Sequence, residues 1–263
     1  MAAEVIVAVT IKREVELRRL REGGKRLAGV LERLAAEVKP GVSTLELDRL
    51  AERLIIADGG IPIFQGYKIR EVKTPYPASI CTSINDEVVH GIPKRELVLQ
   101  VGDVLGIDIG MRWQGLVTDM AVTIGIGGIS PEASRLIRVT REALDLGIAA
   151  IRPGATIGDI GHAVGSHLKK AGLGVIRDLA GHGVGYELHE EPLIPNYGRP
   201  GTGMRLEEGM VLALEPMATL GGQRVVLDDD EWTFRTADGS LAAHFEHTVA
   251  VTRTGQEVLT MAG

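Results

Sequence analysis

The spacing of apolar residues predicts helices that alternate with short strands. Leucines and a valine recur with helical period over residues 13–38, at Leu17, Leu20, Leu27, Val30, Leu31 and Leu34. Ser43 followed by Glu46 has the form of a capping box that opens a second helix, ending near residue 57. Ser130-Pro131 and the pair Thr156 and Asp159 indicate the starts of a third and a fourth helix.

Two segments of the chain occur twice. Residues 39–47 and 152–160 share a basic residue, Pro-Gly, a capping residue and an acid, at an offset of 113. Residues 102–108 and 209–215 match at an offset of 107, and they end on Asp108 and Glu215. Chance similarity is the alternative for the first match, because Pro-Gly before a cap is ordinary helix-entry chemistry. Together the matches predict a domain with two-fold pseudo-symmetry, in which an acid from each half meets near the axis.

Composition narrows the class of protein. The chain has 263 residues, of which 44% are apolar, so one large domain or two small ones can form a core. No apolar run approaches the ~18 residues of a membrane span, and the first residues do not resemble a secretory signal. A single cysteine, Cys81, favours the reducing cytoplasm, and the net charge of −6 gives no general attraction to nucleic acid. The basic run between Lys12 and Arg26 is interleaved with glutamates, which is typical of a solvated helix face.

Five ionisable residues stand in strand-like or glycine-framed segments where apolar groups are expected, namely Asp108, Asp119, His182, Glu215 and Glu246. Asp108 and Asp119 flank a hairpin loop, and a loop centred on residues 113–114 would place the two carboxylates directly opposite each other. Opposed carboxylates repel unless one is protonated or a cation lies between them. The alternative for Asp108 and Asp119 is a pair of exposed acids near the turn, and the alternative for Glu215 and Glu246, taken singly, is a salt-bridged acid. Each candidate histidine (His90, His182, His189) has an ordinary hydrogen-bonded alternative. His244 and His247 alternate with Glu246 and are expected on the opposite face of its strand.

The spacing of these residues excludes several metal sites. The chain has no HExxH motif, no paired cysteines for structural zinc and no EF-hand loop. A carboxylate-rich set with one imidazole suits Mn(II), Fe(II), Co(II) or Zn(II). Four acids and one histidine exceed the needs of one catalytic ion, whereas two ions with bridging carboxylates account for the number.

Combined, these motifs resemble the signature of the type I methionine aminopeptidases, a bacterial-type group in subfamily A of peptidase family M24. The resemblance extends from about residue 12 to 260 and rests on Ser83 to Pro93, Ile107-Asp108, Thr118-Asp119, Gly181 to Gly185, His189 to Pro192, Leu214 to Met217 and Glu246 to Thr248. It implies an α/β pita-bread fold with pseudo-two-fold symmetry, in which helices cover an antiparallel sheet. We expect one catalytic domain over residues 1–263, with halves at about 12–125 and 130–260. The absence of a zinc-finger extension and of the type II insertion favours a compact bacterial-type enzyme.

The resemblance also implies roles for individual residues. Asp108, Asp119, His182, Glu215 and Glu246 match the ligands of two metal ions, with Asp119 and Glu246 as bridges. His90 and His189 match histidines that contact the scissile amide, and Glu215 is our candidate acceptor of the proton of an attacking water. The methionine pocket maps onto Tyr67, Tyr76, Cys81, Leu188 and Trp232. The chain departs from the family at Leu188, where an aromatic residue is usual, and by an insertion at residues 68–75 that includes Lys68, Arg70, Glu71 and Lys73.

We therefore expect a cytoplasmic, monomeric hydrolase that removes the N-terminal methionine from nascent proteins with a small second residue, by attack of a metal-activated water on the first peptide bond. The basic first helix is a candidate for transient docking at the ribosome, and neither a specific nucleic acid nor a membrane is expected as partner. Because Ala2 is small, the protein is expected to lose its own Met1. Two alternatives stay open. One is an X-Pro dipeptidase or aminopeptidase P, which shares the metal ligands, and the other is a binding module of the same fold without catalysis.

Overall fold

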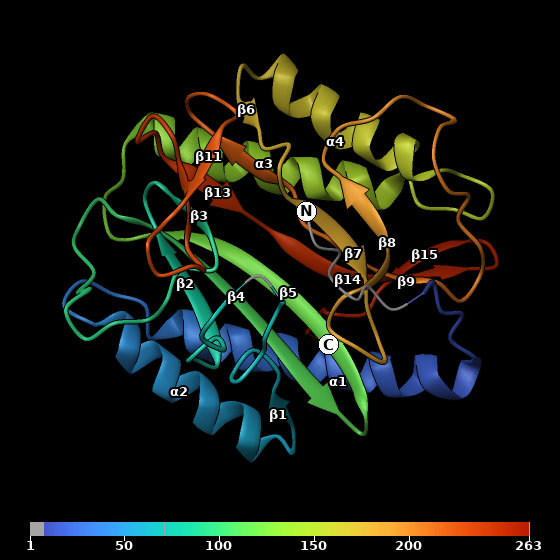
Figure 1. The fold of residues 1–263 in the computed structure, drawn as a ribbon, viewed down its shortest axis with the longest axis horizontal. Helices are drawn as coiled ribbons and strands as arrows, with labels where there is room; N and C mark the ends of the chain where they lie inside the picture. The colour runs from blue at the N-terminus through green and yellow to red at the C-terminus, as the bar shows by residue number, and fades with distance from the viewer. Residues whose placement is uncertain (1–7, 71, 263) are drawn as a thin grey trace.

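The four predicted helices are present in the computed structural model, which describes residues 8–70 and 72–262 (Figure 1). They are α1 (Glu14–Ala36), α2 (Thr44–Ala57), α3 (Pro131–Ala149) and α4 (Ile157–Lys170). The predicted caps are confirmed, because the side chains of Ser43, Ser130 and Thr156 each accept a hydrogen bond from the backbone three residues on. The expectations for Met1 and for Glu71 fall outside the described residues.

One large, mostly antiparallel sheet forms the centre of the molecule. Its main path runs β1 (Ile61–Pro62), β4 (Val104–Trp113), β5 (Leu116–Gly125), β14 (Glu246–Thr252), β9 (Val211–Leu214), β7 (Ala180–Gly183) and β8 (Glu190–Pro195). Outside this path, β2 (Ile80–Ile84) pairs with β4 and β15 (Gly255–Val258) pairs with β14. Two smaller sheets contain β6 (Gly174–Val175), β10 (Met217–Thr219) and β13 (Ala242–His244), and β3 (Glu87–Val89), β11 (Val225–Leu227) and β12 (Phe234–Thr236).

Helices cover the sheet at two ends. In Figure 1, α1 and α2 lie along β4 and β5 at the bottom of the view, and α3 and α4 lie at the top, where α3 contacts β9 and β14 and α4 contacts β8. The apolar stripe of α1 is buried as its period predicts, and Leu27, Leu31 and Leu34 form one core cluster with Ile107 and Ile109 of β4. None of the described helices combines the length and the apolar character that crossing a bilayer requires.

The internal repeat is also visible in the contacts. The Gly41 N–H donates to the Leu99 carbonyl, and the Gly154 N–H donates to the Leu206 carbonyl, both at 2.9 Å. These partners differ by the same offsets of 113 and 107 as the two sequence matches. The central strand order β4-β5-β14-β9 has the corresponding symmetry, because each half contributes an antiparallel pair and the halves meet between β5 and β14. The predicted fold class is confirmed.

The predicted register of the β4–β5 hairpin is wrong. Asp108 pairs with Ala121 and Asp119 pairs with Gly110, so the two aspartates are diagonal neighbours on one face rather than directly opposed. The reason is the turn, whose two central residues are Gln114 and Gly115, with φ of 47° and 83°. A two-residue hairpin loop requires positive φ at both positions, and Gly115 adopts it without strain.

The basic run between Lys12 and Arg26, which lies mostly in α1, is not a uniformly solvated face. Arg18, Arg19 and Lys25 are exposed, as predicted for such a face. Lys12, in contrast, is only 3% exposed, and Arg21 forms an ion pair with Glu257 of β15. Part of this positive charge is therefore neutralised within the fold.

Candidate metal centre and substrate pocket

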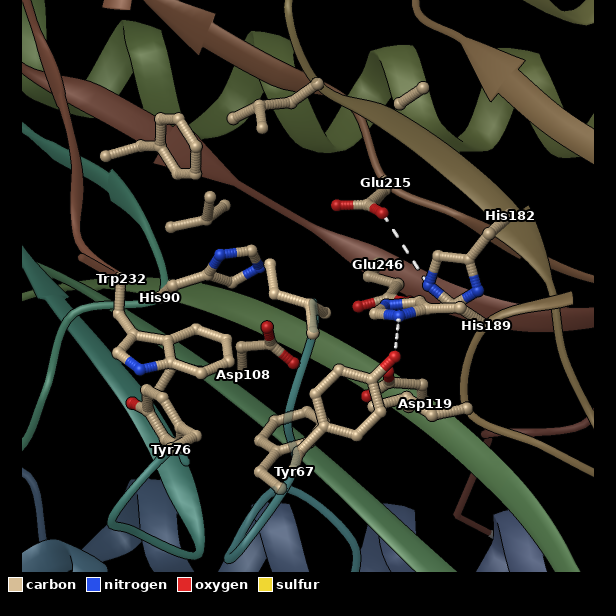
Figure 2. Close-up of a pocket in the computed structure, with 18 of the residues that line it drawn as sticks. Tyr67, Tyr76, His90, Asp108, Asp119, His182, His189, Glu215, Trp232 and Glu246 are labelled. Atoms are coloured by element: carbon tan, nitrogen blue, oxygen red, sulfur yellow. Dashed lines mark hydrogen bonds and ion pairs between the residues drawn. The ribbon is translucent and has the colours of Figure 1, made fainter. Parts of the chain in front are cut away.

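A pocket of about 590 Å³ opens over the inner face of the large sheet. In Figure 2, Tyr76 and Trp232 lie on one side of it, and His90, Asp108 and Tyr67 lie between them and the group formed by Asp119, His182, His189, Glu215 and Glu246. All five predicted ligands line this pocket, as do His90, His189 and all five residues predicted for methionine binding. The structure thus brings together in one pocket every residue predicted to bind metal or substrate.

Strand pairing explains why these side chains converge. Cys81, Asp108, Ala121 and Glu246 follow one another across β2, β4, β5 and β14 in a single row of paired residues. The adjacent row on the same face contains Gly110 and Asp119, and on the far side Ala213 paired with His182. Paired residues share a face of the sheet, so the two rows point into the same pocket. Small residues between the acids leave space there for a ligand.

Three of the predicted ligands meet closely. Asp119, His182 and Glu246 each offer one ligand atom, and these atoms lie within 4.8 Å of one another. Glu215, directly after β9, reaches the same place, with Oε1 3.8 Å from His182 Nε2. Asp108 lies diagonally across the ladder from Asp119 on the same face, and the charge of Asp119 contributes to the raised pKa of Asp108.

The electrostatics of this cluster call for a cation. Burial raises the pKa of Asp119 to about 7, and the neighbouring Glu215 carboxylate adds to the increase. Burial and the neighbouring carboxylates also raise the pKa values of Asp108 and Glu246 well above their ordinary range. Asp108 Oδ1 and Glu246 Oε1 are buried without a hydrogen-bond partner among the described residues. Buried acceptors without donors are costly, and divalent ions would supply the missing positive charge, so these residues fit a metal site.

The tautomer and the charge of His182 suit a metal ligand. Its Nδ1–H donates to the carbonyl of Gly183 at 2.9 Å, so the lone pair is on Nε2, the nitrogen nearest Glu215. Burial lowers the pKa of His182 well below its ordinary value, with a further contribution from His189. A neutral imidazole of fixed tautomer is the form that coordinates a metal.

Neighbouring polar groups hold the acids in place. The Thr248 hydroxyl donates to the Asp119 carbonyl at 2.7 Å and accepts from its N–H at 2.9 Å. The Asn196 amide donates to the Glu215 carbonyl at 2.9 Å. These bonds fix the backbone beneath both carboxylates, which limits their movement. The sequence pattern gave Thr248 no role, although it ends the motif Glu246 to Thr248, and Asn196 belongs to none of the motifs.

The two histidines expected to contact substrate lie at the junction of the charged and apolar sides. His189 Nδ1 is 2.6 Å from the Tyr67 hydroxyl, and its ring meets His182 edge-on with centroids 4.4 Å apart. His90 follows β3 with a positive φ of 59°, and its ring lies edge-on to Phe234. Both side chains line the pocket beside the acids.

The apolar side of the pocket is aromatic and contains the insertion. Tyr76 and Trp232 meet edge-on with centroids 5.3 Å apart, and the Trp232 indole N–H donates to the Thr74 carbonyl at 3.0 Å. The insertion is closed at its base, since the Tyr76 N–H donates to the Tyr67 carbonyl at 2.8 Å. Ile69 and Val72 of the insertion line the pocket, as does Phe64, and none of these three was predicted.

The prediction for His244 is wrong. Its Nε2 lies 3.3 Å from Glu215 Oε2, and the residue is only 3% exposed. The chain passes at Phe245 from the small sheet of β13 into the large sheet of β14, so His244 and Glu246 do not belong to one strand. Even in a continuous strand, residues two positions apart share a face, so the expectation of opposite faces was wrong for His244 and Glu246 and applies only to His247.

Comparisons with known proteins identify relatives over nearly the whole chain. The model of metallopeptidase family M24 matches residues 18–253. The chain is 46% identical to a methionine aminopeptidase of Clostridium acetobutylicum, over 96% of this chain and 99% of that protein. Its structure is similar to the crystal structure of methionine aminopeptidase from Rickettsia prowazekii, with a TM-score of 0.92, 40% identity and coverage of 96% and 100%. A Xaa-Pro dipeptidase from Bacillus anthracis shares the fold alone, with a TM-score of 0.73, 22% identity and coverage of 96% and 62%.

Proposed function

Because this chain belongs to metallopeptidase family M24 and is an aminopeptidase that removes N-terminal methionine, we propose that the pocket in Figure 2 is its active site. One observation carries this assignment. A buried cluster of acids and His182 faces an aromatic wall across a single pocket of about 590 Å³. That arrangement places a hydrolytic centre beside a binding site for one apolar side chain.

The apolar wall suits the thioether of methionine. Tyr76, Trp232 and Cys81 are all less than 9% exposed and offer polarizable contact surface without a charge. Sulfur makes favourable contacts with aromatic rings, so a methionine side chain gains more here than a branched aliphatic one of similar volume. Leu188 stands where the methionine aminopeptidase pattern usually has an aromatic residue. It is buried and still contributes to this wall.

The acidic side would hold two divalent ions, with Asp119 and Glu246 as bridges and Asp108, His182 and Glu215 as further ligands. When bound, such ions act as Lewis acids that activate water and polarise the carbonyl of the first peptide bond. The number of ions rests on the number of acids, and the residues fit Mn(II), Fe(II), Co(II) or Zn(II) equally.

The chain's own residues would then move protons and stabilise charge. Glu215 is our candidate base, because its carboxylate faces the pocket and keeps 14% of its side-chain surface accessible. A Tyr67 hydroxyl that donates to Nδ1 of His189 would leave the imidazole proton on Nε2, from which it could be donated to the carbonyl oxygen of the substrate. His90, beside the acids, would stabilise the amide nitrogen as the bond breaks.

A peptide assay tests the function. We expect the Mn(II)- or Co(II)-loaded protein to release methionine from Met-Gly-Met-Met and to leave an X-Pro peptide intact. Faster cleavage of the X-Pro peptide would replace this assignment with the dipeptidase alternative. Failure to retain any divalent metal after loading would favour the binding module without catalysis.

A narrower expectation concerns partners. Arg18, Arg19 and Lys25 remain exposed on α1 and could contact ribosomal RNA, where nascent chains emerge. Reversing these three charges should reduce co-sedimentation with ribosomes while peptide cleavage stays unchanged. Unaltered co-sedimentation would contradict ribosome docking through this helix.

A further inference from the structure

A fully buried ion pair joins a lining residue of the pocket, Glu190, to Lys12, and neither residue has been given a role so far. Lys12 Nζ is 2.6 Å from Glu190 Oε2, and the two side chains are 1% and 0% exposed. Burial lowers the pKa of Lys12, although Glu190 opposes that change. A buried ion pair of this kind is seldom needed for stability, since apolar residues of similar volume often serve equally well. Its presence here therefore needs another reason.

Glu190 organises the loop that carries His189. Its Oε1 accepts the backbone N–H groups of Tyr186 at 2.6 Å and Glu187 at 3.1 Å, and its Oε2 accepts Thr10 and Lys12. The carboxylate thus closes a tight loop over residues 186–190. A negative charge strengthens these bonds, because hydrogen bonds to an ionised acceptor are stronger than neutral ones.

Lys12 also fills the space under this loop. A Cβ at Gly185 would lie 2.3 Å from Lys12 Cε, so the lysine stem packs directly against the backbone where the loop begins. The Gly185 carbonyl accepts the Val117 N–H at 2.6 Å, and the Lys12 N–H donates to the Gly209 carbonyl at 2.8 Å. Lys12 therefore holds the loop from a position that is itself tied to the chain before β9.

Resting on the function proposed above, we propose that Lys12 is a positioning residue for His189. His189 directly precedes Glu190, so the ion pair fixes its backbone, while the Tyr67 hydroxyl fixes its ring. Glu190 lines the pocket whereas Lys12 is not among its lining residues, so Lys12 acts through Glu190. Displacement of a catalytic group by about 1 Å can lower a rate by about 100-fold, so the anchoring matters for turnover.

Three variants separate positioning from mere stability. In Lys12→Met the stem remains and the charge is lost, which leaves Glu190 unbalanced. In Lys12→Met/Glu190→Gln both charges are lost, while the glutamine carbonyl can still accept the two backbone N–H groups. Arg21→Met is the control, because it breaks a different long-range ion pair, the partly exposed one from α1 to Glu257 of β15.

Steady-state cleavage of Met-Gly-Met-Met by the metal-loaded proteins gives the first readout. Lys12→Met should lower kcat by about tenfold or more, with KM and calorimetric metal affinity changed by less than about twofold. The double variant should regain part of the lost kcat, and Arg21→Met should match the unmodified protein. A kcat for Lys12→Met within about twofold of the unmodified protein would overturn the proposal. Equal losses of kcat in Lys12→Met and Arg21→Met would do the same.

A spectroscopic readout does not depend on activity. In protein labelled with ¹⁵N-histidine, the His189 imidazole signals, assigned with His189→Ala, should shift or broaden in Lys12→Met and stay unchanged in Arg21→Met. Unchanged His189 signals in Lys12→Met would contradict positioning, whatever the enzyme cleaves. Inactive unmodified protein with shifted His189 signals in Lys12→Met would count against the proposed function alone.

Discussion

Replacing Asp119 by asparagine is expected to stabilise the metal-free protein while it removes the response to metal. Asp119 is 4% exposed, and burial raises its pKa from an ordinary value of 3.8 to about 7. Ionising the carboxyl is thus harder in the folded state than in the unfolded one. Since one pKa unit corresponds to about 1.4 kcal/mol, the ionised carboxylate reduces the free energy of unfolding of the metal-free protein by about 4 kcal/mol.

The sign of the pH dependence follows from the same values. Below pH 3.8 the carboxyl is protonated in both states, so it has no effect on stability. Between pH 3.8 and about 7 it ionises in the unfolded state first, and the metal-free fold loses stability as the pH rises. Between pH 5 and pH 8 the loss is about 3 kcal/mol, which corresponds to a decrease in Tm of about 5–10 °C for a chain of this length.

Differential scanning calorimetry in the presence of a chelator tests this value. The difference in Tm between Asp119→Asn and the unmodified protein should grow in favour of the variant from pH 5 to pH 8. The lowered pKa of His182 makes the fold less stable as the pH falls below 6.5, and this contribution to the pH dependence cancels when the two proteins are compared. Glu208→Gln, which changes an exposed carboxylate, serves as the control and should leave the profile unaltered.

Adding Mn(II) or Co(II) at pH 8 completes the test. The metal should raise the Tm of the unmodified protein, because it binds the folded state and compensates the buried charges. The Tm of Asp119→Asn should respond much less, since one proposed bridging ligand is lost. Parallel pH profiles without metal, or an equal metal response of both proteins, would refute the claim that cations balance the ionised Asp119.

Three further predictions concern the site. His189→Ala should lower kcat by about 100-fold or more and change KM less, because a donor to the developing oxyanion is lost; an unchanged kcat would exclude that role. His244→Ala removes the imidazole 3.3 Å from Glu215 and should weaken metal binding by about 10–100-fold in titration calorimetry, with unaltered affinity excluding any influence of His244 on the metal. Ala121→Leu fills the gap between Asp108 and Glu246 and should abolish metal binding while it destabilises the fold by about 1–3 kcal/mol, measured by urea unfolding; normal metal uptake would contradict the arrangement in rows.

Local signals were sufficient for the helices and for the choice of buried acids. A capping box is formed by residues three positions apart, so Ser43 with Glu46 and Thr156 with Asp159 could be recognised from the sequence alone. The wrong register predicted for the β4–β5 hairpin did not change which side chains were expected to point inward. The true pairing of β4 and β5 differs from the predicted one by two residues, and a shift by an even number keeps every side chain on its own face. Which acids point inward could therefore be predicted, whereas their partners across the ladder depended on the turn at Gln114 and Gly115.

The remaining parts of the site depend on contacts between distant segments. Lys12 and Glu190 are 178 positions apart, and a helical charge pattern has no information about such a partner. Thr248 supports Asp119 from 129 positions away, and the motif that contains Thr248 gives no indication of this contact. The break at Phe245 depends on which sheet each strand joins, and the contact of His244 with Glu215 results from that tertiary arrangement. Tertiary pairing determines these features, and a single sequence does not contain a local signal for it.

The two-fold arrangement also explains which half of the fold supplies the proposed metal ligands and which supplies the residues around the substrate. The strands β4, β5, β14 and β9 supply or directly precede one acid each, so the acids surround the pseudo-axis and both halves contribute equally. The features that make the site specific break this symmetry. His182 and His189 come from the second half, while Tyr67, Tyr76 and the insertion come from the first. A symmetric acidic centre can bind cations but has no preferred direction for a peptide. The unequal walls supply that direction, and they require His189 to be held as firmly as the acids, which is the role assigned to Lys12 and Glu190.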